Sequence, residues 1–226
     1  MKNKMTLSES VLGWFYLFLS IFVMSSIMNF LNSKLPTPLS NAWLSFATVC
    51  FSFVIMVLIL HTFLSTAATN VAKDSITTLC AMALGFCVYY TCTTLLSKYM
   101  ASYFTSFFTT QDPYIANMLK LDFVPKAIGI IFLLPCVEEM LYRGVIFNSL
   151  HGHNRVLAYV LSTLIYSSVH LMGSIASQEP ITLFWSFVHY LPAGFTLAWV
   201  YEKSDNIFAP ALLHMIINAM GVFSVR

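Results

Sequence analysis

Uncharged apolar segments recur along the whole chain, each close to the roughly 20 residues that a helix needs to cross a hydrocarbon core about 30 Å thick. They run from Val11 to Leu31, Ala42 to Leu64, Ile76 to Leu96, Val156 to Ala176, Ile181 to Tyr201 and Ile207 to Val225. A further segment, residues 125–150, is interrupted by charged residues. This pattern predicts an all-α fold, a polytopic transmembrane bundle of about seven membrane helices.

The connections between these segments give two further expectations. The polar interval from Lys98 to Lys126 mixes phenylalanines with Lys, Asp and Gln, which fits a short interfacial helix or an ordinary loop. Pro135 and Pro192 lie inside apolar segments, and we expect them to bend their helices. No internal repeat or linker is evident, so residues 1–226 are predicted to form a single membrane domain.

Composition makes the lipid bilayer the main partner of the chain. Hydrophobic residues make up 58% of the sequence and charged residues 9%, which excludes an ordinary soluble domain. The formal net charge of +2 is too small and too dispersed to indicate nucleic acid as a partner. The cysteines lie in apolar segments without a paired CxxC motif and are interpreted as small core residues.

Three charged residues in the stretch FLLPCVEEMLYRGVIF need an explanation, because burying charge at membrane depth costs several kcal/mol. Glu139 and Arg143 are four residues apart, so they share a helix face and can form a purely structural ion pair. Glu138 lies about 100° away from Glu139 around the helix, so Arg143 cannot easily form an ion pair with both carboxylates. Glu138 is therefore a candidate functional residue.

Polar residues in the next helices reach a similar depth. Counting about 1.5 Å per residue from one side of the membrane, Glu138 lies at roughly 20 Å, His170 at 22 Å, His214 at 13 Å and Asn218 at 20 Å. Each histidine taken alone is more often a satisfied core residue than a catalyst. The shared depth predicts an internal cavity, with the active site inside the C-terminal four-helix core.

Two chemistries suit this set of residues. A carboxylate with histidines can deprotonate a water molecule and pass the proton to a leaving amine, while a second histidine and an asparagine donate to an oxyanion. Alternatively, Glu138, His170 and His214 are the two histidines and one carboxylate that a catalytic zinc ion uses. The residue types leave both mechanisms open.

The motifs EExxxR at Glu138, aromatic-xxx-His ending at His170 and HxxxN starting at His214 resemble those of the CPBP family. This is the family of CAAX proteases and bacteriocin-processing enzymes, also called Abi. Gly144 after the arginine and the run APALLH fit as well. The resemblance covers roughly residues 125–222, which would form the protease core, with residues 1–124 contributing the N-terminal helices and a polar connection.

The resemblance implies an intramembrane endopeptidase of a bacterial cell membrane, acting on a membrane-associated, prenylated or leader-type peptide. It implies that Glu138 and His170 activate water and that His214 and Asn218 hold the oxyanion. Glu139, Arg143 and Tyr166 would support the site; at Tyr166 the family usually has phenylalanine. We favour a mechanism without a metal, with zinc on Glu138, His170 and His214 as the alternative.

A non-catalytic protein is the second hypothesis. A bacteriocin-immunity or regulatory membrane-binding protein could keep the same motif for structure alone. The complete set of acids, histidines and asparagine favours catalysis. The sequence contains no HExxH, GxSG or GxGD motif, so the zincin, rhomboid-type and presenilin-type routes to peptide cleavage are not indicated.

Overall fold

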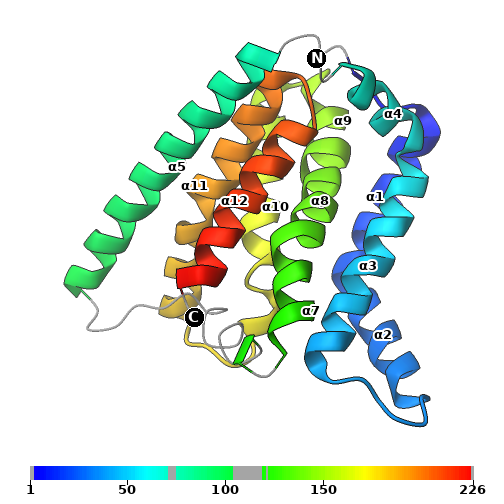
Figure 1. The fold of residues 1–226 in the computed structure, drawn as a ribbon. Coiled ribbons are helices and arrows are strands. Elements are labelled where there is room, and N and C mark those ends of the chain that lie inside the picture. Colours follow the sequence, from blue (N-terminus) through cyan, green and yellow to red (C-terminus); the bar gives the residue numbers. More distant parts are fainter. Residues whose placement is uncertain (1–2, 71–74, 104–118, 121, 225–226) are drawn as a thin grey trace.

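The described part of the computed structural model is helical and contains no strand; it covers residues 3–70, 75–103, 119–120 and 122–224 (Figure 1). The prediction of an all-α helical bundle is confirmed. The expected interfacial helix or loop between Lys98 and Lys126 falls largely outside the described residues.

Four helices form the N-terminal part of the bundle: α1 (Leu7–Phe22), α2 (Met24–Ser33), α3 (Asn41–Ile59) and α4 (His61–Asn70). Thr6 caps α1 in a reciprocal arrangement with Glu9, which satisfies backbone donors at the start of the helix. The first apolar segment, expected as one helix, is bent by 59° between α1 and α2. The hydroxyl of Ser20, just before this bend, donates a hydrogen bond to the carbonyl of Leu17. Such side-chain bonds to the helix backbone often accompany helix bending.

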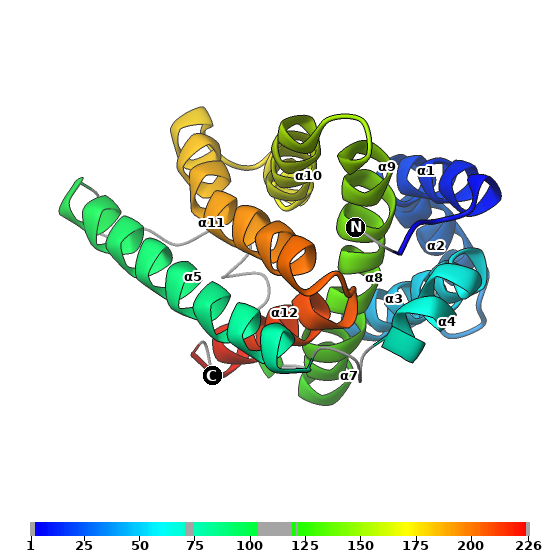
Figure 2. The same ribbon diagram turned by 90° about the horizontal axis from the view of Figure 1, so that it is seen from above.

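A long helical run carries the charged stretch across the middle of the molecule. Its segments are α7 (Phe123–Ile128), the π-helical turns η2 (Gly129–Leu133), α8 (Leu134–Glu139), the π-helical turns η3 (Met140–Phe147) and α9 (Asn148–His151). Helices α1 to α4 lie on one side of this run, and the remaining long helices lie on the other (Figures 1 and 2). At Pro135, where a bend is predicted, the structure has the π-helical turns of η2 immediately before α8. The bend itself stays a prediction.

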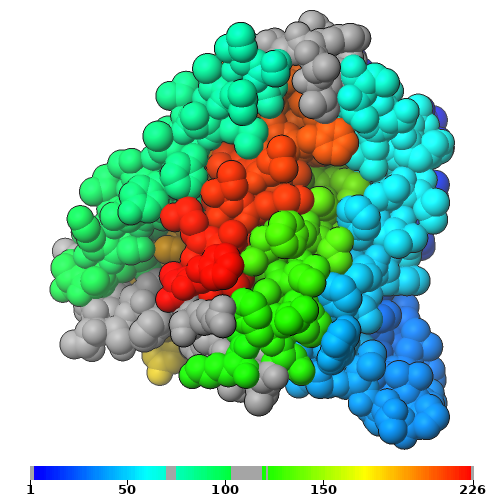
Figure 3. Space-filling model, viewed as in Figure 1, coloured from blue at the N-terminus to red at the C-terminus, as the bar shows by residue number. Residues whose placement is uncertain are grey.

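The other long helices are α5 (Ser75–Tyr103), α10 (Arg155–Val169), α11 (Pro180–Ser204) and α12 (Phe208–Ser224). α11 packs against α5 and α10, and it continues as a helix through Pro192. α12 packs against η2 and α8, and the space-filling view shows it filling the space between α5 and the α7–α8 segment (Figure 3). These contacts place α8, α10, α11 and α12 around one interior.

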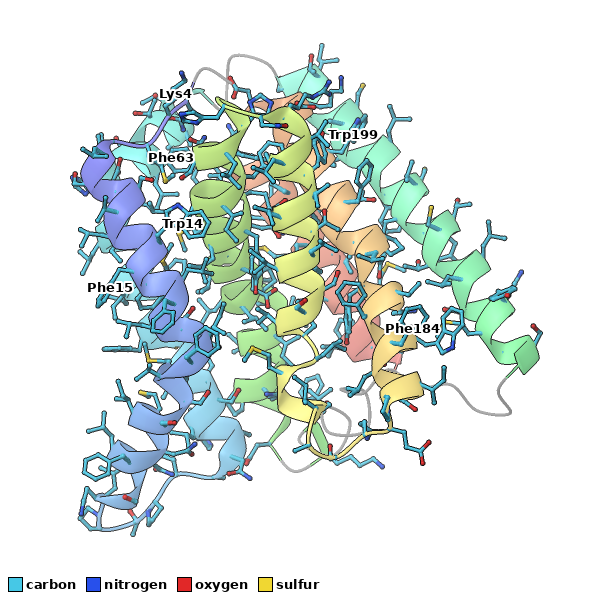
Figure 4. All side chains as sticks on the ribbon, turned by 180° about the vertical axis from the view of Figure 1, so that it is seen from behind. Lys4, Trp14, Phe15, Phe63, Phe184 and Trp199 are labelled. Atoms are coloured by element: carbon cyan, nitrogen blue, oxygen red, sulfur yellow. The ribbon has the colours of Figure 1, made fainter. Side chains whose placement is uncertain are left out.

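Several helices have the length and composition of a membrane span. Among the described residues, α3, α5, the segment Arg155–Ser174 and α11 meet this test singly, and the bent pair α1 with α2 meets it together. Large apolar side chains such as Phe15 and Phe184, 60% and 55% exposed, cover the outer faces (Figure 4). Such a surface is stable in hydrocarbon and would aggregate in water.

Polar contacts fasten the helices at the end of the bundle that holds the N-terminus. The Glu202 carboxylate accepts hydrogen bonds from Arg155 Nε at 2.6 Å and Tyr159 Oη at 2.8 Å, and pairs with His151 Nε2 at 2.8 Å. Glu9 Oε1 accepts the backbone N–H of Phe63 at 2.8 Å, which ties α1 to the start of α4. The Glu202 contacts fix α9, α10 and α11 relative to one another at this end of the bundle.

Candidate active site

The candidate site is assembled from four helices. α8 carries Glu138 and Glu139, η3 carries Arg143, and the C-terminal end of α10 carries Tyr166 and His170. α12 contributes His214 and Asn218, one helical turn apart. π-helical turns lie on both sides of the Glu138–Glu139 pair, and such turns occur frequently at functional sites.

Glu139 forms the buried centre of the cluster. Its Oε1 atom accepts from Arg143 Nη1 at 2.9 Å and lies 2.8 Å from His214 Nδ1. The exposed fractions of these side chains are 0% for Glu139 and Arg143 and 1% for His214. The expected Glu139–Arg143 pair is confirmed as a contact, and the structure adds His214 as a second partner of the same oxygen.

Arg143 also reaches across to α11. Its Nη2 atom donates to the carbonyl of Gly194 at 2.7 Å, and its guanidinium lies 5.1 Å from the centre of the Tyr166 ring. A Cβ atom at position 194 would come within 3.1 Å of Thr163 Cγ2 and 3.2 Å of Tyr166 Cδ1. Glycine therefore permits the close packing of α11 on α10 that brings this carbonyl to the arginine.

Glu138 faces the two histidines. Its Oε1 atom lies 3.8 Å from His170 Nε2, and its Oε2 atom lies 3.5 Å from His214 Nε2. Both distances exceed those of direct N–H···O hydrogen bonds. The Glu138 and His170 side chains are 11% and 14% exposed, so they are more accessible than Glu139 and Arg143. The accessible face of the cluster is therefore the face formed by Glu138 and His170.

His170 is held at the C-cap of α10, where the helix ends. Its Nδ1 atom lies 2.8 Å from the backbone carbonyl of Tyr166, and its ring lies between the rings of Tyr166 and Tyr190, at centroid distances of 4.4 and 4.6 Å. A carbonyl only accepts hydrogen bonds, so Nδ1 carries the proton and the Nε2 lone pair of the neutral ring faces Glu138.

Tyr190 is a residue that sequence reasoning missed. It lies within an apolar segment and belongs to no motif, so nothing in the sequence singles it out. Tyr166, which was expected to support the site, also brings its hydroxyl to 3.5 Å from His214 Nε2. Its ring contacts Tyr142 edge-on at a centroid distance of 5.4 Å.

Asn218 lies in a different environment from the one expected. Its Nδ2 atom donates to the backbone carbonyl of Ile130 in η2 at 2.9 Å, and no contact with Glu138, His170 or His214 is recorded among the described residues. An amide nitrogen has two hydrogens, so one remains for another acceptor. The oxyanion role of Asn218 stays a prediction.

The charges of the buried cluster balance only with one added proton. Glu138 and Glu139 carry two negative charges and Arg143 carries one positive charge. A buried net charge is costly, so one further proton would neutralise the cluster. The Nε2 and Nδ1 atoms of His214 face the two carboxylates.

A metal centre does not follow from this arrangement. The described ranges contain no group of three His, Cys, Asp or Glu side chains placed to hold one metal ion. The choice between the metal-free and zinc mechanisms stays a prediction.

Comparison with known proteins connects this geometry to a family. Residues 120–220 match the family model of the type II CAAX prenyl endopeptidase Rce1-like proteins. This segment of the chain is similar to the Rce1-like proteins. All of the site residues described above, from Ile130 to Asn218, fall inside the matched residues 120–220. A second model, of a protein family of unknown function, matches residues 60–133.

Similar proteins occur in bacteria. The chain is 30% identical over 94 residues to the UPF0177 protein YxdF of Lactococcus lactis, covering 42% of this chain and 46% of that protein. It is 25% identical over 138 residues to YaiF of the same organism, covering 56% and 58%. It is 29% identical over 89 residues to the "Putative membrane peptidase YdiL" of Bacillus subtilis, covering 39% and 32%.

The matched segments thus span about half or less of the relatives YxdF and YdiL, and under two thirds of YaiF. No solved structure matches the chain. The apolar helices, together with the match to the Rce1-like model, identify a multi-pass membrane protein.

Proposed function

We propose that the chain is an intramembrane endopeptidase that hydrolyses a peptide bond with water activated by Glu138 and His170. The observation that carries this proposal is the position of Glu138, whose two carboxylate oxygens face Nε2 atoms of two histidines. Each histidine is oriented through its Nδ1 atom, by the Tyr166 carbonyl or by Glu139.

The reaction begins with Glu138 as carboxylate and His214 as imidazolium, the state in which the buried cluster is neutral. A water molecule between Glu138 and His170 gives its proton to Glu138, and its oxygen attacks the carbonyl carbon of the scissile bond. The oxygen of that carbonyl becomes an oxyanion, which accepts a hydrogen bond from His214 Nε2 and from the second amide hydrogen of Asn218.

Collapse of this intermediate completes the hydrolysis. The C–N bond breaks, and Glu138 returns its proton to the leaving nitrogen. The products are a carboxylic acid and an amine, and the cluster regains its starting charge. Glu139 accepts the Nδ1–H of His214 throughout, so the ring keeps its orientation and its Nε2–H stays directed at the oxyanion.

The proposed substrate is a membrane-associated peptide, of the prenylated or the leader type. Two features support this class. The site lies within a bundle whose outer surface is apolar, so the scissile bond must reach membrane depth. The matching family model is that of CAAX prenyl endopeptidases.

A non-catalytic binder, such as a bacteriocin-immunity protein, is the alternative function. The UPF0177 relatives carry no activity in their names, which leaves room for this class. A binder has no need for an accessible carboxylate facing two oriented histidines, and this geometry favours the peptidase.

Proteomics of membranes distinguishes the two functions. Membranes that contain the wild type are compared with membranes that contain Glu138→Gln, and peptides whose termini depend on Glu138 are identified. Glu179→Gln, at the start of α11 and outside the site, is the matched control. A set of termini lost only in Glu138→Gln supports the peptidase. Identical peptide patterns in all three samples would reject it.

A further inference from the structure

The π-helical turns before Glu138 contain a carbonyl that the helix itself cannot satisfy. In η2 the backbone N–H of Leu134 donates to the carbonyl of Gly129, five residues earlier. In this register the next carbonyl, that of Ile130, would accept from the residue at position 135. Position 135 is proline, which has no N–H.

Asn218 supplies the missing donor from another helix. Its Nδ2 atom lies 2.9 Å from the Ile130 oxygen, and α12 packs along η2 and α8. A backbone carbonyl away from water needs such a partner, because none is available from the bilayer. The side-chain amide therefore takes the place of the backbone N–H that Pro135 lacks.

We propose that Asn218 is a positioning residue that holds the π-helical turns of η2 in register and thereby sets the position of Glu138. Glu138 lies eight residues after Ile130 on the same continuous helical run. Asn218 lies one turn after His214, so the bond also fixes α12 against α8. A single amide thus couples the position of the carboxylate to that of the histidine that faces it.

The role predicts energetic coupling between Asn218 and Pro135. The inference deepens the proposed function, but stability is its main readout and requires no peptidase activity. The experiment is a double-mutant cycle with Asn218→Ala and Pro135→Ala, measured as thermal unfolding of the full chain in detergent. Alanine at position 135 restores a backbone N–H that can serve the Ile130 carbonyl.

The expected result is a lower Tm for Asn218→Ala in the wild-type background and a much smaller loss in the Pro135→Ala background. Pro192→Ala, which restores an N–H within α11, is the matched control and should leave the loss unchanged. If Asn218→Ala fails to accumulate as folded protein, Pro135→Ala should rescue it and Pro192→Ala should not. Equal losses in all backgrounds, or no rescue, would overturn the inference.

Activity then separates positioning from oxyanion binding. Positioning alone predicts that the Pro135→Ala, Asn218→Ala double variant recovers much of the cleavage lost in Asn218→Ala. A double variant that is stable yet cleaves no better than Asn218→Ala shows an additional contact with the oxyanion. Absence of any Glu138-dependent cleavage in the wild type would reject the proposed function and leave the stability result standing.

Discussion

Nδ1 of His214 lies 2.8 Å from Oε1 of Glu139, the same oxygen that accepts from Arg143. A carboxylate only accepts hydrogen bonds, so the proton resides on Nδ1 and the Nε2 atom of His214 is directed at Glu138. The second glutamate of the pair therefore has two tasks, to neutralise the arginine and to orient the histidine. Loss of Arg143 would leave it without the first partner.

Arg143→Ala is expected to destabilise the fold. Removing one partner of a buried ion pair leaves the other charge uncompensated, at a cost of about 3–5 kcal/mol. Arg155→Ala is the matched control, because Arg155 is 63% exposed and an exposed pair contributes about 0–1 kcal/mol. Chemical unfolding in detergent measures both variants. Equal stability of the two would show that Arg143 is not the internal counter-ion.

Glu138→Gln should abolish cleavage without a comparable loss of stability. Glutamine keeps the shape of the side chain but cannot accept the proton of water, and general acid–base groups contribute about 100-fold or more to the rate. Kinetics of the purified protein on a substrate found by proteomics, beside a thermal unfolding curve, provide the measurement. A variant that keeps more than about a tenth of the wild-type turnover contradicts the role of Glu138 as base.

Helical spacing and depth predicted the central contacts of the site. The four-residue spacing of Glu139 and Arg143 required a shared face, and the contact is present. The depth count grouped Glu138 with His170, His214 and Asn218, and the structure brings the first three side chains together. The Asn218 amide instead donates to the Ile130 carbonyl. In an α-helix the spacing of residues along the chain determines the face and the depth of each side chain, so these relationships can be predicted from the sequence.

Other contacts depend on features that spacing does not report. The partner of Asn218 follows from the π register around Pro135, which adds a residue to the turn and changes which carbonyl lacks a donor. The contact of Tyr190 with His170 depends on how α11 crosses the end of α10. The bend at Val23 has no Pro or Gly beside it to mark it, since Gly13 lies ten residues earlier. Each depends on tertiary packing.

Tyr190→Leu is expected to lower turnover, whereas Tyr190→Phe should retain it. The rings of Tyr190 and Tyr166 both pack against the His170 ring, so an aromatic ring at position 190 helps to fix the imidazole. Removing the ring frees an imidazole that lies at the end of a helix. Phe184→Leu, on the exposed face of the same helix, is the control for general loss of packing.

Nuclear magnetic resonance of labelled histidines tests the same contact without catalysis. The His170 ring lies 4.4 and 4.6 Å from two tyrosine rings, so its proton resonances should be shifted by their ring currents. The shift should move toward the free-histidine value in Tyr190→Leu and stay in Tyr190→Phe. Loss of turnover in Tyr190→Phe equal to that in Tyr190→Leu would assign the effect to the hydroxyl and contradict the role of the ring.

The metal content of the active protein decides between the two mechanisms. We expect purified, active enzyme to contain no stoichiometric transition metal and to cleave in the presence of a strong chelator. The physical reason lies in the charge of the cluster. Arg143 and one proton already balance Glu138 and Glu139, whereas a bound zinc ion would add two positive charges at the same place.

Elemental analysis of the wild type beside His214→Ala and His153→Ala makes this measurement specific. His153 lies exposed in the loop after α9, so zinc lost only in that variant is bound at the surface. Zinc that serves catalysis would be present at one ion per chain and would disappear, together with activity, in His214→Ala, because ligand loss releases the metal. That outcome would make Glu138, His170 and His214 zinc ligands and replace the glutamate mechanism.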